Sequence, residues 1–172
     1  QFIESVGDVS ADATVAQRCD WFSLRGEVAG AMRDFDLAES WMRRASEVQP
    51  NSPWRLVCHA HVLEWEDRYD VALETARRAC EIRPWYRPGV QAIGHLLSLL
   101  NRETEAIDFL REALGQIESA HVAAQCYALL LELDRFAEAA EMLDRYVALS
   151  PLMEKRVQQW LAAQRSILAY EA

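Results

Sequence analysis

DFDLAESWMRRASEVQP (residues 34–50) and RYDVALETARRACEIRP (residues 68–84) are two versions of one pattern, set 34 residues apart. In both stretches apolar residues recur at helical spacing, and arginines lie toward the end, where cations suit the helix dipole. Both stretches end in proline, which cannot continue a helix. Because the chain has no segment with sustained alternation of apolar and polar residues, the sequence predicts helices and no strands.

The pattern extends over most of the chain, because the sequence matches itself at offsets of 34, 34 and 33 residues. A helical pair needs small residues where its helices cross, an aromatic residue near the turn and a proline at its end. The recurring columns are Ala38, Ala72, Ala106 and Ala139; Gly26, Ala60 and Gly94; Phe35, Tyr69 and Phe136; and Pro50, Pro84 and Pro151. The third unit has Glu103 in the aromatic column and Glu118 in the proline column.

A period of 34 with this pattern resembles the tetratricopeptide repeat, a helix–turn–helix unit. The resemblance implies an all-α fold, a right-handed α-solenoid of four helical hairpins with a C-terminal capping helix. The second unit matches the pattern best, and the third is the most degenerate. The predicted divisions are a linker or the end of an upstream region at 1–11, repeats within 12–153 (about 19–52, 53–86, 87–119 and 120–153) and a cap at 154–172.

The predicted cap has an apolar face formed by Met153, Val157, Trp160, Leu161, Ile167 and Leu168. Gln164 falls within this face and interrupts it. Solenoids need a terminal helix with a polar outer side to close the core. Ser52–Pro53 and Ser150–Pro151 each read as an N-cap followed by a first-turn proline, and we expect the first helix to begin near Asp12.

Composition indicates which classes of partner and which cellular compartment suit this chain. The formal net charge is 18 − 27 = −9, and the basic residues are scattered among acidic ones, which disfavours nucleic-acid binding. No apolar run approaches the ~18 residues needed to span a bilayer, so we expect no membrane partner. Four dispersed cysteines without a C-x-x-C pair indicate buried thiols in a reducing compartment, and we expect a cytoplasmic protein.

Motifs for catalysis are missing from the sequence. It has no glycine-rich phosphate loop, no G-x-S-x-G and no H-E-x-x-H, so we expect neither an enzyme nor a cofactor. Cys58 and His59 are neighbours on a helix and point apart, so they do not form a nucleophile–base pair. His59 and His61 differ by ~200° around a helix, so they cannot share a metal ion.

The resemblance implies that the first helix of each pair lines a concave groove. The candidate groove residues are Glu27, Trp54, Val57, His61, Glu64, Trp65, Gln91, His95, Leu99 and His121. The aromatic and aliphatic members would supply apolar contacts, and the polar members would orient a peptide. For His61 and His95 three readings stay open: solvated histidines bonded to carboxylates, peptide contacts, or metal ligands together with Glu27.

These residues predict a protein-interaction scaffold that binds a peptide or partner segment. The groove lacks the lysine, arginine and asparagine side chains that grip acidic chaperone tails in related domains, and Glu27 would repel such a tail. We therefore expect a neutral or basic protein ligand, and self-association stays open. Because the chain begins at Gln1, the alternative is a substrate-positioning accessory domain of a larger enzyme whose catalytic domain lies outside this chain.

Overall fold

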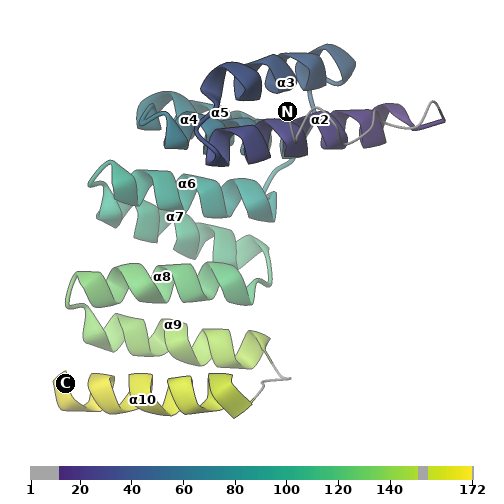
Figure 1. The fold of residues 1–172 in the computed structure, drawn as a ribbon. Helices are drawn as coiled ribbons and strands as arrows, with labels where there is room; N and C mark the ends of the chain where they lie inside the picture. The colour runs from purple at the N-terminus through teal and green to yellow at the C-terminus, as the bar shows by residue number, and fades with distance from the viewer. Residues whose placement is uncertain (1–11, 151–154, 172) are drawn as a thin grey trace. The chain divides into compact units, whose positions relative to one another are not determined.

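The computed structural model describes residues 12–150 and 155–171, and every regular element within these ranges is an α-helix (Figure 1). The helices of the described residues are α2 (Val15–Ala31), α3 (Phe35–Val48), α4 (Pro53–Trp65), α5 (Tyr69–Ile82), α6 (Arg87–Leu99), α7 (Glu103–Gln116), α8 (Ala120–Glu132), α9 (Phe136–Leu149) and α10 (Lys155–Glu171). The all-α helical-repeat fold predicted from the sequence is confirmed. The chain divides into two compact units after Leu96, within α6.

In the first unit, α2 packs against α3, α4 packs against α5, and α2 also packs against α4 (Figure 1). A cluster of buried residues from α2, α3 and α4 forms part of the core: Ala29, Ala38, Met42, Cys58 and Val62. Met42 is the largest of these side chains, and it fits because small residues surround it. Removing apolar surface of this kind from water is the main force that holds helical pairs together.

In the second unit, α8 packs against both α7 and α9, and α10 packs against α9. Glu138 on α9 accepts hydrogen bonds from Arg111 on α7, at 2.6 Å, and from Arg135, at 2.7 Å. These bonds to Arg135 and Arg111 lower the pKa of the Glu138 carboxyl to about 2. A charged group thus ties α7 to α9 at the surface of the unit.

The predicted alanine column is the helix-crossing column. Its members Ala38, Ala72, Ala106 and Ala139 are all fully buried, as the repeat pattern predicts. Gly26 shows why small residues are required there. A Cβ at Gly26 would lie 2.7 Å from Cε of Met42 and 3.2 Å from the carbonyl oxygen of Ala38. The helices approach too closely for a larger residue without rearrangement.

The turn within each helical pair has the same geometry four times. In these turns the residues with positive φ are Arg33 (61°), Asp67 (60°), Asn101 (56°) and Asp134 (55°), and they follow the 34, 34, 33 offsets of the sequence. A fifth such residue, Trp85 (55°), lies between α5 and α6. The amide after each of the four turn residues bonds back to the end of the preceding helix, for example Asp34 N to Ala29 O at 3.0 Å. This left-handed residue ends the first helix and reverses the chain.

The start of α4 has the predicted capping residues, and the start of α2 lies a few residues later than predicted. Ser52 caps α4 by accepting from the Arg55 amide at 3.3 Å, and Pro53 opens the helix, as expected. The first described helix begins at Val15 rather than near Asp12, because Thr14 and Gln17 form a reciprocal capping box. Ser150 ends α9, and its predicted partner Pro151 lies outside the described residues, as do residues 1–11 and Met153.

The terminal helix α10 packs through a narrower face than predicted. Leu161 and Leu168 are buried, and Trp160 meets the rings of Tyr127 and Tyr146 edge-on. Ile167 is 47% exposed, so its placement in the packed face is wrong. The packed positions run from Leu161 through Gln164 to Leu168, which is the i, i+3, i+7 spacing of one helix side.

Candidate functional site

The two neighbouring histidines of α4 point to different helices. His59 Nε2 lies 3.1 Å from Oε1 of Glu39 on α3, whereas His61 Nδ1 lies 2.6 Å from Oε1 of Glu27 on α2. This divergence is the one expected for residues two apart on a helix. The H-x-H spacing therefore does not make a shared site, and only His61 faces the α2 side of α4.

Glu27 organises the environment of His61. Its Oε1 meets the imidazole, and its Oε2 accepts a bond from the Cys58 thiol at 3.6 Å. Burial, together with the negative charge of Glu27, raises the pKa of Cys58 far above its ordinary value. The thiol is therefore held protonated, and it is a hydrogen-bond donor to Glu27 instead of a nucleophile.

A second histidine–carboxylate pair follows on the next repeat. His95 Nε2 on α6 lies 2.9 Å from Oε1 of Glu64 on α4. This hydrogen bond to Glu64 raises the pKa of His95 above its ordinary value, against the opposing effect of its partial burial. The charged imidazole is thus more favoured at His95 than in a free histidine.

Trp65 lies beside the first pair. Its ring centroid is 6.3 Å from that of His61, with the planes tilted by 47°. Gly30 on α2 makes room for this indole, since a Cβ there would lie 2.9 Å from the Trp65 ring. Trp65 is half-buried against the core of the first unit, as is Trp54. We call Glu27, His61, Glu64, Trp65 and His95 the histidine strip; it runs over α2, α4 and α6.

The other predicted groove residues lie elsewhere. Val57 is 1% exposed and packs with Leu56 and Ala79 in the core, so its side chain is a core contact and not a surface one. Gln91 on α6 is half-buried. Leu99 and His121 are exposed residues of the second unit and are described apart from the strip.

The strip provides hydrogen-bonding groups and an aromatic surface. Within residues 12–150 and 155–171, no group of three or more His, Cys, Asp or Glu side chains is placed to hold a metal ion. All four cysteines are free.

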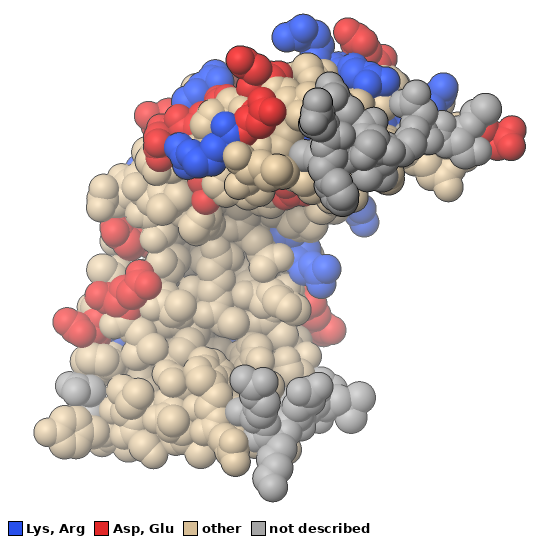
Figure 2. All heavy atoms as spheres, viewed as in Figure 1, with Lys and Arg blue, Asp and Glu red and all other residues tan. Residues whose placement is uncertain are grey.

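In the same part of the chain no helix is long and apolar enough to cross a lipid bilayer. Acidic and basic side chains are interspersed over the N-terminal helices on the face that Figure 2 shows.

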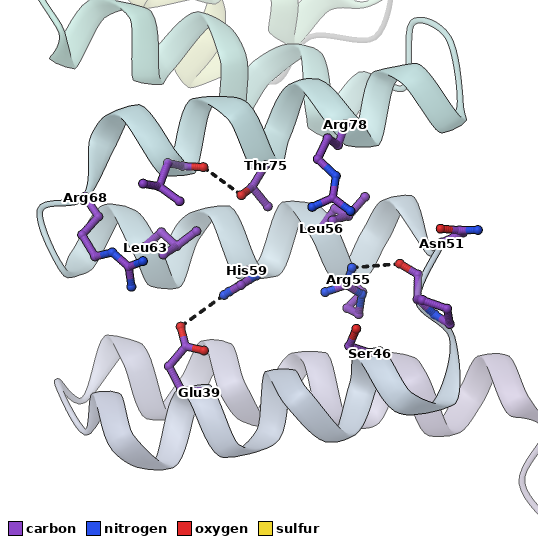
Figure 3. A pocket seen from close by; sticks show the side chains of 12 residues that line it. Glu39, Ser46, Asn51, Arg55, Leu56, His59, Leu63, Arg68, Thr75 and Arg78 are labelled. Atoms are coloured by element: carbon purple, nitrogen blue, oxygen red, sulfur yellow. Dashed lines mark hydrogen bonds and ion pairs between the residues drawn. The ribbon is translucent and has the colours of Figure 1, made fainter.

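A pocket between α3, α4 and α5 was missed by sequence reasoning (Figure 3). Its volume is about 430 Å³, and its lining includes the buried Arg55. The sequence does contain an indication of this pocket. Arg55 occupies a repeat position that holds Trp21, Gly89 and Val122 in the other repeats. One charged residue in an otherwise uncharged column marks a place where one repeat differs from its neighbours.

Comparison with known proteins agrees with this architecture. A tetratricopeptide repeat model matches residues 90–119. The matched segment lies in the third predicted unit, which lacks the aromatic residue and the proline, so neither residue is necessary for the match. None of the curated proteins compared with the chain is a match.

Three solved structures are similar to the chain. PilF of Pseudomonas aeruginosa has a TM-score of 0.74 and 21% identity, with 91% of this chain and 70% of that one covered. The MamA protein has a TM-score of 0.60 and 14% identity, with 79% and 75% covered. A thermophilic TPR protein of Thermus thermophilus has a TM-score of 0.51 and 16% identity, with 84% and 98% covered. The repeat match at residues 90–119 and the shared all-α fold together confirm the resemblance to the tetratricopeptide repeat found in the sequence.

Proposed function

We propose that this chain is a protein-interaction module whose histidine strip binds a neutral or basic peptide segment of a partner. Tetratricopeptide repeats in general mediate contacts between proteins. The four-unit division of residues 19–153 and a cytoplasmic location belong to the same proposal. The four free cysteines fit a reducing compartment.

The observation that carries the proposal is that a histidine–carboxylate pair occurs on each of two successive repeats. Glu27 with His61, at 2.6 Å, and Glu64 with His95, at 2.9 Å, hold two carboxylates in fixed positions on neighbouring helices. A carboxylate accepts several hydrogen bonds, so each retains capacity for a ligand's N–H groups. Carboxylates that are already oriented lose little side-chain entropy on binding, which favours affinity.

Charge and aromatic surface favour a ligand that is not acidic. Glu27 and Glu64 give the strip two carboxylates, and the strip contains no lysine or arginine. An acidic segment would be repelled there, whereas a lysine or arginine side chain would be attracted. The half-buried Trp65 indole next to His61 adds a face on which an alkyl chain or a guanidinium group can rest.

The test uses selection from a random peptide library displayed on beads, with the purified chain as bait. We expect the selected peptides to be poor in Asp and Glu. The double variant Glu27→Gln, Glu64→Gln should bind them at least ~10-fold more weakly, because charge-assisted hydrogen bonds are stronger than neutral ones.

The matched control is Glu47→Gln, Glu74→Gln, which removes two exposed carboxylates from α3 and α5 and changes the net charge equally. It should bind the selected peptides as the parent chain does. An equal loss in both double variants would mean that net charge and not the strip drives binding. Selection of Asp- and Glu-rich peptides would contradict the proposed ligand class.

A further inference from the structure

The pocket between α3, α4 and α5 has two ends with different charge arrangements (Figure 3). Glu39, His59 and Arg68 lie at one end, and Arg55, Arg78 and Asn51 lie at the other. Three arginines and one glutamate line it, which gives 3 − 1 = +2 with His59 neutral. This local excess of positive charge stands out in a chain whose net charge is −9.

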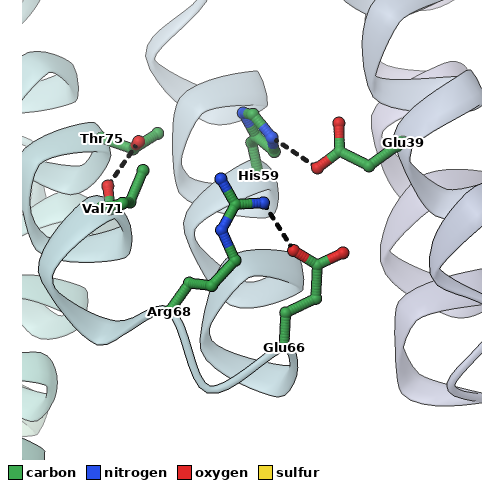
Figure 4. A network of polar contacts seen from close by, with 6 residues as sticks. All are labelled: Glu39, His59, Glu66, Arg68, Val71 and Thr75. Atoms are coloured by element: carbon green, nitrogen blue, oxygen red, sulfur yellow. Dashed lines mark hydrogen bonds and ion pairs between the residues drawn. The ribbon is translucent and has the colours of Figure 1, made fainter.

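At the first end the histidine and the arginine each have a carboxylate partner (Figure 4). His59 Nε2 lies 3.1 Å from Glu39 Oε1, and Arg68 Nη1 lies 2.8 Å from Glu66 Oε2. Thr75 donates to the carbonyl oxygen of Val71 at 2.8 Å within its own helix. The polar groups of this end are thus satisfied by the protein itself.

At the second end the cations have no such partner. Arg55 is 5% exposed, and its Nη2 donates to the carbonyl oxygen of Pro50 at 2.9 Å. Its buried Nε has no acceptor. Among the described residues no carboxylate lies within ion-pair distance of Arg55 or of the exposed Arg78.

The two arginines also oppose each other. Burial is the main cause that lowers the pKa of Arg55, and the positive charge of Arg78 adds to it. A buried guanidinium without a counter-ion is costly, because it has lost water and gained no opposite charge. An anion between the two groups would supply the missing acceptors and remove the repulsion.

The repeat pattern does not require this arginine. The positions equivalent to Arg55 hold Trp21, Gly89 and Val122, so an uncharged residue fits the same place in the fold. In the first repeat the position equivalent to Arg78 is Arg44. Its guanidinium stacks over Phe22 and Trp41, at 4.3 and 4.4 Å from the ring centroids. The second repeat (53–86) is therefore the one with an arginine at both positions.

We propose that this pocket binds an oxyanion, a carboxylate or a phosphate group, between Arg55 and Arg78. Asn51 and Ser46 line the same end and add hydrogen-bond donors. Leu56, Leu63 and Val71 form an apolar wall that suits an organic body attached to the anion. A volume of about 430 Å³ is in the range of ordinary small-ligand sites.

This site is independent of the histidine strip. Its anion-binding end uses α3, α5 and the α4 side that faces them, whereas the strip uses α2, α6 and the other α4 side. Failure of peptide binding at the strip would leave the anion site standing, and the reverse holds as well.

The experiment titrates the chain at constant ionic strength with three probes, followed by calorimetry and by amide chemical shifts. The probes are inorganic phosphate, a capped Gly-Glu-Glu-Gly peptide and its Gly-Gln-Gln-Gly counterpart. We expect saturable binding of phosphate or of the glutamate peptide, with shifts centred on α4 and α5, and none of the glutamine peptide. Phosphate binding alone would identify a free oxyanion as the ligand, and glutamate-peptide binding would identify a carboxylate of a partner protein.

Arg78→Gln is the decisive variant, because Arg78 is exposed and its replacement leaves the core unchanged. It should weaken binding at least ~10-fold, since a charge-assisted contact is lost. Arg43→Gln, an exposed residue of α3 outside the pocket, changes the net charge equally and should have no effect. Lack of saturable binding of both anionic probes, or equal weakening by Arg43→Gln, would overturn the proposal.

Arg55→Met supplies a second readout. Without an anion, this variant should be at least as stable as the parent chain, because replacing an uncompensated buried charge by an apolar side chain removes a cost. Phosphate at saturating concentration should raise the Tm of the parent chain and leave that of Arg55→Met unchanged. A phosphate-induced rise of equal size in both proteins would place anion binding elsewhere and overturn the site.

Discussion

The Tyr127 hydroxyl on α8 donates a 2.7 Å hydrogen bond to Oε1 of Gln164 on α10. Gln164 interrupts the apolar face of the terminal helix in the sequence, and this bond is the reason that an amide is suitable there. The Tyr127 residue is buried, so its hydroxyl needs an acceptor from within the protein. The contact fixes the rotation of α10 in the second unit.

Tyr127→Phe should lower the free energy of unfolding by about 1 kcal/mol, because Gln164 loses its donor. Urea denaturation measures the change, and Tyr170→Phe at a position that is 87% exposed is the control. The double variant Tyr127→Phe, Gln164→Leu should cost less than the sum of the single changes, since both polar partners are gone. Additive costs would mean that the bond does not couple the helices.

Ala72→Leu should lower the free energy of unfolding by about 1–3 kcal/mol, because the added side chain overpacks a helix crossing. Ala72 is fully buried in α5, whereas Ala162 is exposed on α10 and supplies the control Ala162→Leu. Thermal and urea unfolding of both variants check the result. Equal stability of Ala72→Leu and the parent chain would contradict the register of the repeat.

The fold could be predicted because the repeat pattern marks both where the helices cross and where they begin. Alanines at 34-residue offsets identify the helix crossings, and Ser52 with Pro53 identifies a helix start, since both depend on local backbone geometry. The partner of each histidine was harder to predict. Glu27 and His61 share a column, but His95 bonds Glu64, 31 residues away, because long side chains reach across columns.

Other features depend on exact helix rotation or on three elements at once. Sequence spacing locates the buried face of a helix only to within about one residue position. It therefore predicts an exposed Val57 and a packed Ile167, whereas Val57 is buried and Ile167 is exposed. The pocket around Arg55 needs α3, α4 and α5 together, and periodicity within a single helix carries no information about such a space.

The His95–Glu64 pair predicts a pH-dependent term in stability. The folded pKa of His95 is raised by its bond to Glu64, so the stabilisation is complete below the unfolded pKa of about 6.5 and is lost as pH rises through the folded value. The stability difference between the parent chain and His95→Gln should therefore be larger at pH 6 than at pH 9. It should stay below about 1 kcal/mol, because the side chain is 51% exposed.

Urea denaturation at both pH values measures this difference. Leu99→Gln, at an exposed position of the same helix and without a titratable group, is the control and should differ from the parent chain by the same amount at both pH values. A larger effect of His95→Gln at pH 9 than at pH 6 would contradict the proposed charge interaction.

Asn101→Val should lower the free energy of unfolding by about 1–2 kcal/mol. Asn101 has φ of 56°, a left-handed conformation that asparagine tolerates and a β-branched residue does not. Thr104→Val, at an exposed position three residues later in α7, is the control and should change stability little. Circular dichroism during thermal unfolding checks both variants. A neutral Asn101→Val would mean that this turn relaxes at no cost.

The four left-handed turns also limit where this chain can change in length. Each joins its two helices through three residues, at 32–34, 66–68, 100–102 and 133–135. One inserted residue would disturb the bond that the turn makes back to the preceding helix, such as Asp34 N to Ala29 O, and with it the position of the second helix. The connection at 117–119 contains no such residue and includes the exposed Glu118. A fluorescent tag or a grafted recognition loop therefore belongs at 117–119, where added length leaves the pairing inside each repeat unchanged.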